Sequence, residues 1–291
     1  MQNYTPLRDI IKRYGIGAKK SLGQHFLLDP NLCSRIARST GPLEKINVIE
    51  IGPGPGGLTR ALLDNGAKSV VTIEKDTRCI KALAELQAIY PKRLEVIEAN
   101  ALKTNIVQLI PRPRSIIANL PYNIATTLLL KWFNQINEFE NLALMFQKEV
   151  AQRLVAKPGS KSYGRLSIIT QWLCKTQYNF DIKKQAFTPA PKVDSSVITL
   201  KPRDQPLIPA SRDNLEIVTA MAFGQRRKMI RSSLKALNIK FSDLGIKPTA
   251  RAEELTIEQF CHIANSISDL SPFRGQTSQG QLGDHASGVQ P

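Results

Sequence analysis

Two short segments carry residues that could hold a small molecule and act on an amine, and the first of them is rich in glycine. The segment EIGPGPGG runs from Glu50 to Gly57 and joins an apolar stretch to an amphipathic one. Its glycines, Gly52, Gly54, Gly56 and Gly57, allow a tight turn and a close approach of the backbone to a ligand. Their spacing departs from GxGxxG, so the turn favours a nucleoside cofactor over a dinucleotide.

Polar side chains follow the next two apolar runs. Glu74 ends the second predicted strand, 22 residues after Gly52, where a carboxylate can accept hydrogen bonds from ribose hydroxyls. NAD and S-adenosylmethionine both carry such a ribose, so Glu74 does not choose between them. Asn100 follows the third predicted strand, and we expect its amide to contact the adenine ring of the cofactor; a plain turn residue is the alternative.

The second segment, NLPYNI at 119–124, decides the chemistry. The exocyclic amine of adenine is a poor nucleophile because its lone pair is delocalised into the ring. Acceptors that hold its hydrogens favour a pyramidal nitrogen, and we expect these to be the Asn119 side chain and the Leu120 carbonyl. Pro121 fixes the turn, and Tyr122 offers a ring on which an unstacked base can lie. The pattern predicts methyl transfer that depends on orientation, with no Ser, His and Asp set.

The elements that position these residues form an α/β pattern. From about residue 46 to 147, short apolar runs alternate with amphipathic stretches, which predicts a mostly parallel sheet with helices on both faces. Beyond residue 150, we read LSIITQWLC, TQYNFDI and SSVITL as strands that extend the sheet with antiparallel edge strands. From about 211 the chain turns helical in LEIVTAMAF, RRKMIRSSLKAL and ARAEELTIEQFCHIANSI. We expect a cofactor-binding domain over 1–205, a helical domain over 206–270 and a disordered tail over 271–291.

Positive charge gathers in one region of the chain. The net charge is +16, and residues 151–240 alone carry 17 Lys and Arg against 5 Asp and Glu. This concentration favours a surface that binds a polyanion, although a merely soluble basic face is the alternative. The basic residues that we expect on and around one helix are Arg226, Arg227, Lys228, Arg231 and Lys235. A phosphate track could also include Lys157, Lys161, Arg165, Lys183 and Lys184.

Several classes of protein do not fit the sequence. No apolar run approaches the roughly 18 to 20 residues of a membrane span, and the N-terminal residues lack the apolar core of a signal peptide, so we expect a cytoplasmic protein. The four cysteines form no CxxC pair, and we expect buried, reduced thiols and no metal site.

From about residue 15 to 268 the chain resembles the ribosomal RNA adenine N6,N6-dimethyltransferases, above all the small-subunit branch, and eight segments carry the resemblance. They are SLGQHFL, EIGPGPGGLT, IEKD, NLPYNI, QKEVAQRL, YGRLS, FTPAPKVDS and FGQRRKMIRSSL. The resemblance implies a Rossmann-like class I methyltransferase sheet and S-adenosylmethionine as cofactor. It also implies a monomer that acts on two adjacent adenines of a 16S rRNA loop in the small ribosomal subunit, with no membrane or DNA partner.

The resemblance also assigns residues. It places the target base between Tyr122 and Phe187. The cofactor site that it implies consists of His25, Leu27, Gly52, Glu74, Asn100 and Asn119. The family normally has Asn at position 25 and Asp at position 100, and we expect both changes to be tolerated because each side chain can still accept a hydrogen bond. Three other functions stay open: a large-subunit rRNA adenine methyltransferase, a non-catalytic RNA-binding assembly factor and an NAD-dependent dehydrogenase.

Overall fold

A computed structural model describes residues 4–267 of the chain and divides it into two compact units. Among the described residues, the first unit consists of 4–151 and Gln177–Pro202, and the second of Gln152–Thr176 and 203–267. The second unit therefore contains a stretch that the sequence analysis assigned to the first domain. The predicted disordered tail at 271–291 lies outside the described residues.

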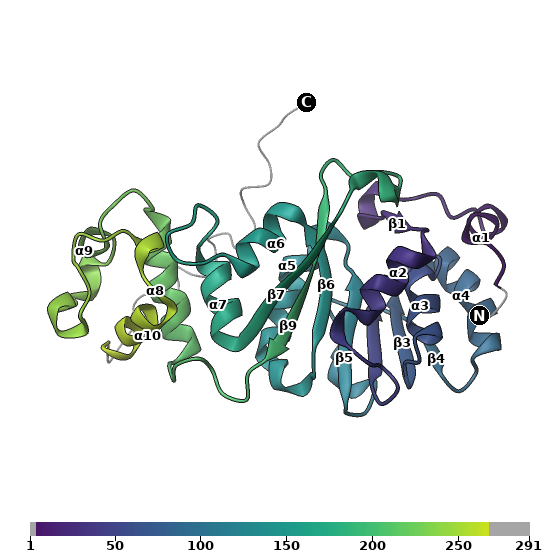
Figure 1. Ribbon diagram of the computed structural model, residues 1–291, viewed down its shortest axis with the longest axis horizontal. Coiled ribbons are helices and arrows are strands. Elements are labelled where there is room, and N and C mark those ends of the chain that lie inside the picture. The colour runs from purple at the N-terminus through teal and green to yellow at the C-terminus, as the bar shows by residue number, and fades with distance from the viewer. Residues whose placement is uncertain (1–3, 268–291) are drawn as a thin grey trace. The chain divides into compact units, whose positions relative to one another are not determined.

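The first unit is built around a seven-stranded sheet with the order β4-β3-β2-β5-β6-β9-β7 (Figure 1). The pairs from β4 to β6 are parallel, and β9 pairs antiparallel with β6. The sheet predicted from the alternating runs is therefore confirmed, including its antiparallel extension. The strands are β2 (Asn47–Ile51), β3 (Ser69–Glu74), β4 (Leu94–Glu98), β5 (Arg114–Asn119), β6 (Leu142–Gln147), β7 (Cys174–Ile182) and β9 (Ser195–Pro202).

Helices pack against this sheet through apolar side chains. One core cluster joins Ile36, Leu62 and Leu83 from three successive helices to Val48 and Val70 on two central strands. Every residue of β2 is buried, as expected for a parallel strand covered on both faces. The helices that lie in this unit are α1 (Leu7–Arg13), α2 (Pro30–Ala37), α3 (Gly57–Asp64), α4 (Thr77–Ile89) and α5 (Tyr122–Trp132), and α6 (Lys148–Val155) is divided between the two units.

A second, two-stranded sheet lies within the same unit. Strand β1 (Phe26–Leu27) pairs antiparallel with β8 (Phe187–Thr188), and Leu27 lies opposite Phe187. The pairing links the N-terminal segment SLGQHFL to the segment FTPAPKVDS, which follows it by about 160 residues.

The second unit is helical, and it corrects one of the predicted strands. The run LSIITQWLC forms helix α7 (Arg165–Leu173), not a strand. It is buried on nearly all sides, and a short, wholly buried apolar run does not reveal its period. The indole Nε1 of Trp172 donates to the carbonyl of Ile208 at 2.7 Å within the same unit. The other helices are α8 (Arg212–Gly224), α9 (Ile230–Ser233) and α10 (Ile257–Asn265).

The helix predicted over RRKMIRSSLKAL is also shorter than expected. Only Ile230–Ser233 is α-helical, Lys235–Leu237 forms a 3₁₀ turn, and residues 226–228 lie in the turn after α8. An antiparallel bridge between Met229 and Arg251 interrupts the helical path, so the chain changes direction there. The basic residues of this segment therefore do not share one helix.

The structure also bears on the membrane and cysteine predictions. Within residues 4–267, no helix combines the length and the apolar character needed to cross a membrane. All four cysteines are buried and free of disulfides, as predicted. In the same range no cluster of His, Cys, Asp and Glu side chains could hold a metal ion.

Candidate active site

A pocket opens at the carboxyl ends of the parallel strands of the first unit. The turns that follow β2, β3, β4 and β5 all line it, because parallel strands end at the same edge of a sheet. Residues 21–27 of the N-terminal segment form another part of its wall. The sequence-predicted residues in the lining are His25, Leu27, Gly52, Glu74, Asn100, Asn119, Leu120, Pro121 and Tyr122.

The glycine turn after β2 is packed so tightly that side chains would not fit. Gly54 has a φ of +55°, and a Cβ there would lie 2.9 Å from the ring of Phe26. A Cβ on Gly57 would lie 2.5 Å from the carbonyl oxygen of Leu27. Glycine at these positions lets the turn lie directly against the N-terminal segment and leaves the pocket open to a ligand.

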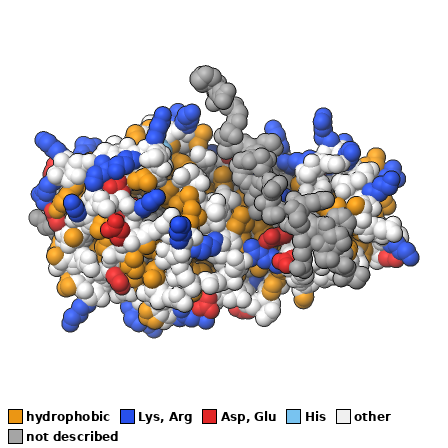
Figure 2. Space-filling model, turned by 180° about the vertical axis from the view of Figure 1, so that it is seen from behind, with side chains coloured by type: hydrophobic (Ala, Val, Ile, Leu, Met, Phe, Trp, Pro, Cys, Tyr) orange, Lys and Arg blue, Asp and Glu red, His pale blue; other side chains and the backbone are white. Residues whose placement is uncertain are grey.

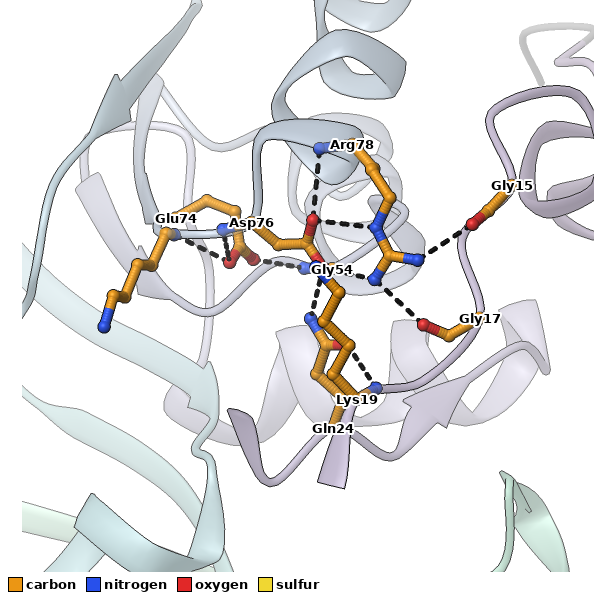
Figure 3. Close-up of polar contacts among 9 residues, drawn as sticks. Gly15, Gly17, Lys19, Gln24, Gly54, Glu74, Asp76 and Arg78 are labelled. Carbon is orange, nitrogen blue, oxygen red and sulfur yellow. Dashed lines mark hydrogen bonds and ion pairs between the residues drawn. The ribbon is translucent and has the colours of Figure 1, made fainter. Parts of the chain in front are cut away.

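Glu74 is held in place by three backbone amides. Its Oε2 accepts from the Gly54 amide at 3.1 Å, and its Oε1 accepts from the amides of Lys75 and Asp76 at 2.7 and 2.9 Å (Figure 3). Burial raises the pKa of Glu74, and the three amides oppose that rise. Each carboxylate oxygen has two lone pairs, so Oε1 is fully used by two amides, whereas Oε2 can still accept from a ligand hydroxyl.

Asn100 uses its side-chain oxygen to shape its own turn. Oδ1 accepts from the Leu102 amide at 3.0 Å, and the Asn100 carbonyl accepts from the Thr104 amide at 3.1 Å. An adenine amine in the pocket would have to share the same Oδ1. An Asp at this position would have a second oxygen for that contact.

The side chain of Asn119 has a defined orientation. Its Nδ2 donates to the His25 carbonyl at 3.2 Å, which leaves Oδ1 as the acceptor. Next to it, the ring of Tyr122 stacks on the imidazole of His25 with centroids 5.5 Å apart, and its hydroxyl hydrogen-bonds Ser195. The imidazole Nδ1 is 2.8 Å from the carbonyl of Pro189, so Nδ1 carries the hydrogen. An amide acceptor and an aromatic face thus lie side by side in the pocket wall.

Phe187 does not line the pocket. Its side chain is 3% exposed and belongs to the core cluster that includes Ile182 and Val197. Its place in the two-stranded sheet, opposite Leu27, turns it into the interior. The structure therefore does not bring Phe187 together with Tyr122 as two faces of a base site.

Glu50 is a pocket residue that the sequence analysis did not single out. It is 1% exposed, and its Oε2 accepts from the Thr59 hydroxyl at 2.7 Å. Burial, with a smaller contribution from the charge of Glu74, raises the pKa of Glu50 to about 8. Its position inside an apolar strand was a visible signal, because a Glu in a wholly buried strand is rare.

The basic residues after α8 are exposed but do not act alike. Arg226 donates to the carbonyls of Lys161 and Tyr163, both at 3.0 Å, and therefore holds a loop of its own unit. With the residues that the structure describes, the side chains of Arg227, Lys228, Arg231 and Lys235 make no hydrogen bond or ion pair, and all four are exposed. On the face drawn in Figure 2, Lys and Arg side chains are spread among other types.

The strand order, the glycine turn and the carboxylate at the end of β3 together define the class. They are those of a Rossmann-like class I methyltransferase, with an α/β sheet that is parallel except at one edge. The solved structures similar to this chain agree. A dimethyladenosine transferase from Plasmodium falciparum is 28% identical, with 82% of this chain and 96% of that chain covered and a TM-score of 0.70. The 23S rRNA methyltransferase ErmE is 26% identical, with 84% and 100% covered and a TM-score of 0.64.

The sequence comparisons define the family. The family model for ribosomal RNA adenine dimethylase matches residues 16–269. The ribosomal RNA small subunit methyltransferase A of Rhodospirillum rubrum is 54% identical over 265 residues, which cover 90% of this chain and 92% of the relative. That of Paramagnetospirillum magneticum is 55% identical over 271 residues, with 92% and 96% covered. This chain belongs to the ribosomal RNA adenine dimethylase family, as its motifs predicted.

Proposed function

We propose that this protein transfers methyl groups from S-adenosylmethionine to the N6 amines of two adjacent adenines in a 16S rRNA loop, which gives dimethyladenosines. The observation that carries the proposal is the position of Asn119. Its Oδ1 is left to accept beside the Tyr122 ring, in the same pocket as the glycine turn and Glu74. Relatives named small subunit methyltransferase A, more than half identical to this chain, support the 16S assignment.

The residues present fit the cofactor. Glu74 is oriented to accept from a ribose hydroxyl through Oε2, and Gly52 and Gly54 have no side chains that could fill the pocket. Asn100 accepts from the adenine amine through the oxygen that also accepts from Leu102. When bound, S-adenosylmethionine supplies a methyl group made electrophilic by its sulfonium sulfur.

The side chains of the NLPY turn prepare the target amine. We assign Asn119 Oδ1 and the Leu120 carbonyl as acceptors that hold its hydrogens and direct its lone pair. Pro121 begins helix α5 without a competing amide donor, and Tyr122 stacks on the base, which contributes about 1–3 kcal/mol. The nitrogen that takes the methyl group becomes acidic and loses one proton to solvent, so no strong base is needed.

We propose that the small ribosomal subunit binds through the basic residues of the second unit. The exposed side chains of Arg227, Lys228, Arg231 and Lys235 are available for phosphates, and Arg226 supports the turn that presents them. Bases of a single-stranded loop are cheaper to unstack than those of a duplex, which suits a loop target. A cytoplasmic monomer with no membrane or DNA partner completes the proposal.

Mass mapping of rRNA tests the function. The protein is incubated with unmethylated small subunits and labelled S-adenosylmethionine, and two adjacent dimethyladenosines in 16S rRNA are expected. Methyl groups on large-subunit RNA would favour the other rRNA branch, and cofactor binding without transfer would favour an assembly factor. Asn119→Ala and Tyr122→Ala should reduce transfer far more than RNA retention on a filter; equal losses would contradict their roles.

A further inference from the structure

The N-terminal segment crosses one side of the pocket as a strap, defined here as residues 15–24. Residues 21–24 of the strap line the pocket, yet its regular structure is confined to one 3₁₀ turn at Lys20–Leu22. It contains Gly15, Gly17 and Gly23, and Gly15 and Gly23 have positive φ angles of 58° and 62°. A segment with three glycines loses much conformational freedom when it is ordered, so contacts must hold it in place.

One side chain from helix α4 forms hydrogen bonds with the backbone of this strap. Arg78 Nη1 donates to the Gly15 carbonyl at 2.8 Å, and Nη2 donates to the Gly17 carbonyl at 2.9 Å (Figure 3). The residue between them, Ile16, is 1% exposed and packs in a small apolar cluster with Phe26 and Cys79. The guanidinium therefore binds the carbonyls on both sides of Ile16, the buried residue that anchors the strap.

The same guanidinium is tied to the turn that follows β3. Arg78 Nη2 and Nε lie 2.7 and 3.0 Å from the two carboxylate oxygens of Asp76, which also accepts from Gln24 Nε2 at 3.0 Å. The Asp76 amide in turn donates to Glu74. Asp76 thus connects the strap, through Arg78 and Gln24, to Glu74, whose carboxylate we assign to the cofactor ribose.

We propose that Arg78 is a positioning residue that latches the strap over the cofactor pocket, so that cofactor affinity depends on a side chain outside the pocket lining. The inference rests on the proposed function for the identity of the cofactor. A planar guanidinium can reach two carbonyls and both oxygens of a carboxylate at once, whereas an ammonium cannot. The Arg78 bonds also hold the pKa of Asp76 at about 2, so the latch stays charged at every pH at which the protein would be assayed.

The latch should act on binding and not on the methyl-transfer step. If removal of Arg78 lowers the closed fraction of the strap to about one tenth, the apparent Kd for S-adenosylmethionine rises about tenfold. With saturating cofactor the strap closes again, so kcat and the KM for small subunits should stay within about twofold to threefold. Arg78→Lys should give an intermediate Kd, because one ammonium can keep Asp76 but not both carbonyls.

The experiment compares full-length Arg78→Ala and Arg78→Lys with a matched control, Arg13→Ala. Arg13 makes an ion pair of 2.8 Å with Glu85, also between the N-terminal segment and α4, but touches neither the strap nor Asp76. Calorimetry gives the Kd for S-adenosylmethionine, and hydrogen exchange read by mass spectrometry reports opening of residues 15–24. We expect faster exchange in the strap and a weaker Kd for Arg78→Ala, and neither for Arg13→Ala.

Three results would overturn the latch. They are an unchanged Kd together with unchanged strap exchange, a loss of kcat at saturating cofactor with the Kd preserved, and faster exchange throughout the first unit, which would mean a general folding role. Failure of the proposed function looks different. In that case the wild-type protein transfers no methyl group to small subunits, whereas the effect of Arg78→Ala on strap exchange without cofactor would still be seen.

Discussion

Replacement of Glu50 by Gln should make the protein more stable at alkaline pH. Glu50 is 1% exposed and accepts from the Thr59 hydroxyl. Gln has the same shape as the protonated acid, can accept the same hydrogen bond through its amide oxygen and never ionises. The substitution therefore removes the cost of a buried charge and keeps the packing.

The pKa of Glu50 sets the sign and the size of the effect. In the unfolded chain the carboxyl ionises near its ordinary value of 4.5, whereas burial raises its pKa in the folded protein to about 8. Between these values the folded state holds a proton that the unfolded state has lost, so the free energy of unfolding falls as the pH rises. At about 1.36 kcal/mol for each pH unit, the loss reaches at most about 5 kcal/mol at pH 8. Because the effective dielectric constant is about 20 even at buried sites, we expect a measured loss of about 2–4 kcal/mol.

Urea unfolding at pH 5, 7 and 9 measures the effect. The wild-type protein and Glu50→Gln should have similar stability at pH 5, and the variant should be more stable by a growing margin at pH 7 and 9. Glu44→Gln, the same change at an exposed residue, is the control and should follow the wild type. Parallel stability curves for wild type and Glu50→Gln across this range would refute the reasoning.

Three further predictions concern the pocket and the RNA surface. Gly57→Ala should lower the free energy of unfolding by about 1–3 kcal/mol and weaken cofactor binding, because the added Cβ would overlap the Leu27 carbonyl. Thermal melting and calorimetry measure the two effects, and an unchanged melting temperature would contradict the prediction. Asn100→Asp should tighten S-adenosylmethionine binding by about 1–2 kcal/mol, since a second, charged oxygen becomes available; equal or weaker calorimetric affinity would count against this. Arg231→Ala should lower the salt dependence of small-subunit binding by about one unit of slope, measured by filter binding from 50 to 200 mM salt; an unchanged slope would remove Arg231 from the phosphate contacts.

The parallel sheet could be predicted because buried parallel strands are continuous apolar runs separated by amphipathic helices. The ends of these strands then placed Glu74, Asn100 and Asn119 at one edge, and the structure brings all three to one pocket. The prediction of a strand where α7 lies was wrong for the same physical reason that the predictions of the parallel strands were right. A short run buried on nearly all sides has no polar face to show its period.

What could not be read from the sequence depends on contacts between distant segments. Arg78 follows the IEKD motif, but its hydrogen bonds to the carbonyls of Gly15 and Gly17 form only when the N-terminal segment packs against α4. The interior position of Phe187 depends on the pairing of β8 with β1. The NLPY motif likewise predicts an amide acceptor, whereas the orientation of Asn119 comes from the carbonyl of His25.

The helical unit draws on two separate stretches of the chain, and this limits how the protein can be divided. Helix α7 precedes β7 and β9 in the chain. Trp172 on that helix donates a hydrogen bond to the carbonyl of Ile208, which follows them. A single cut after Pro202 would therefore remove the packing partners of α7 and expose its buried apolar side chains to water. The protein thus cannot be reduced to a free-standing catalytic module by trimming one end, and exchange of its helical unit between relatives would need three matched junctions, at 151/152, 176/177 and 202/203.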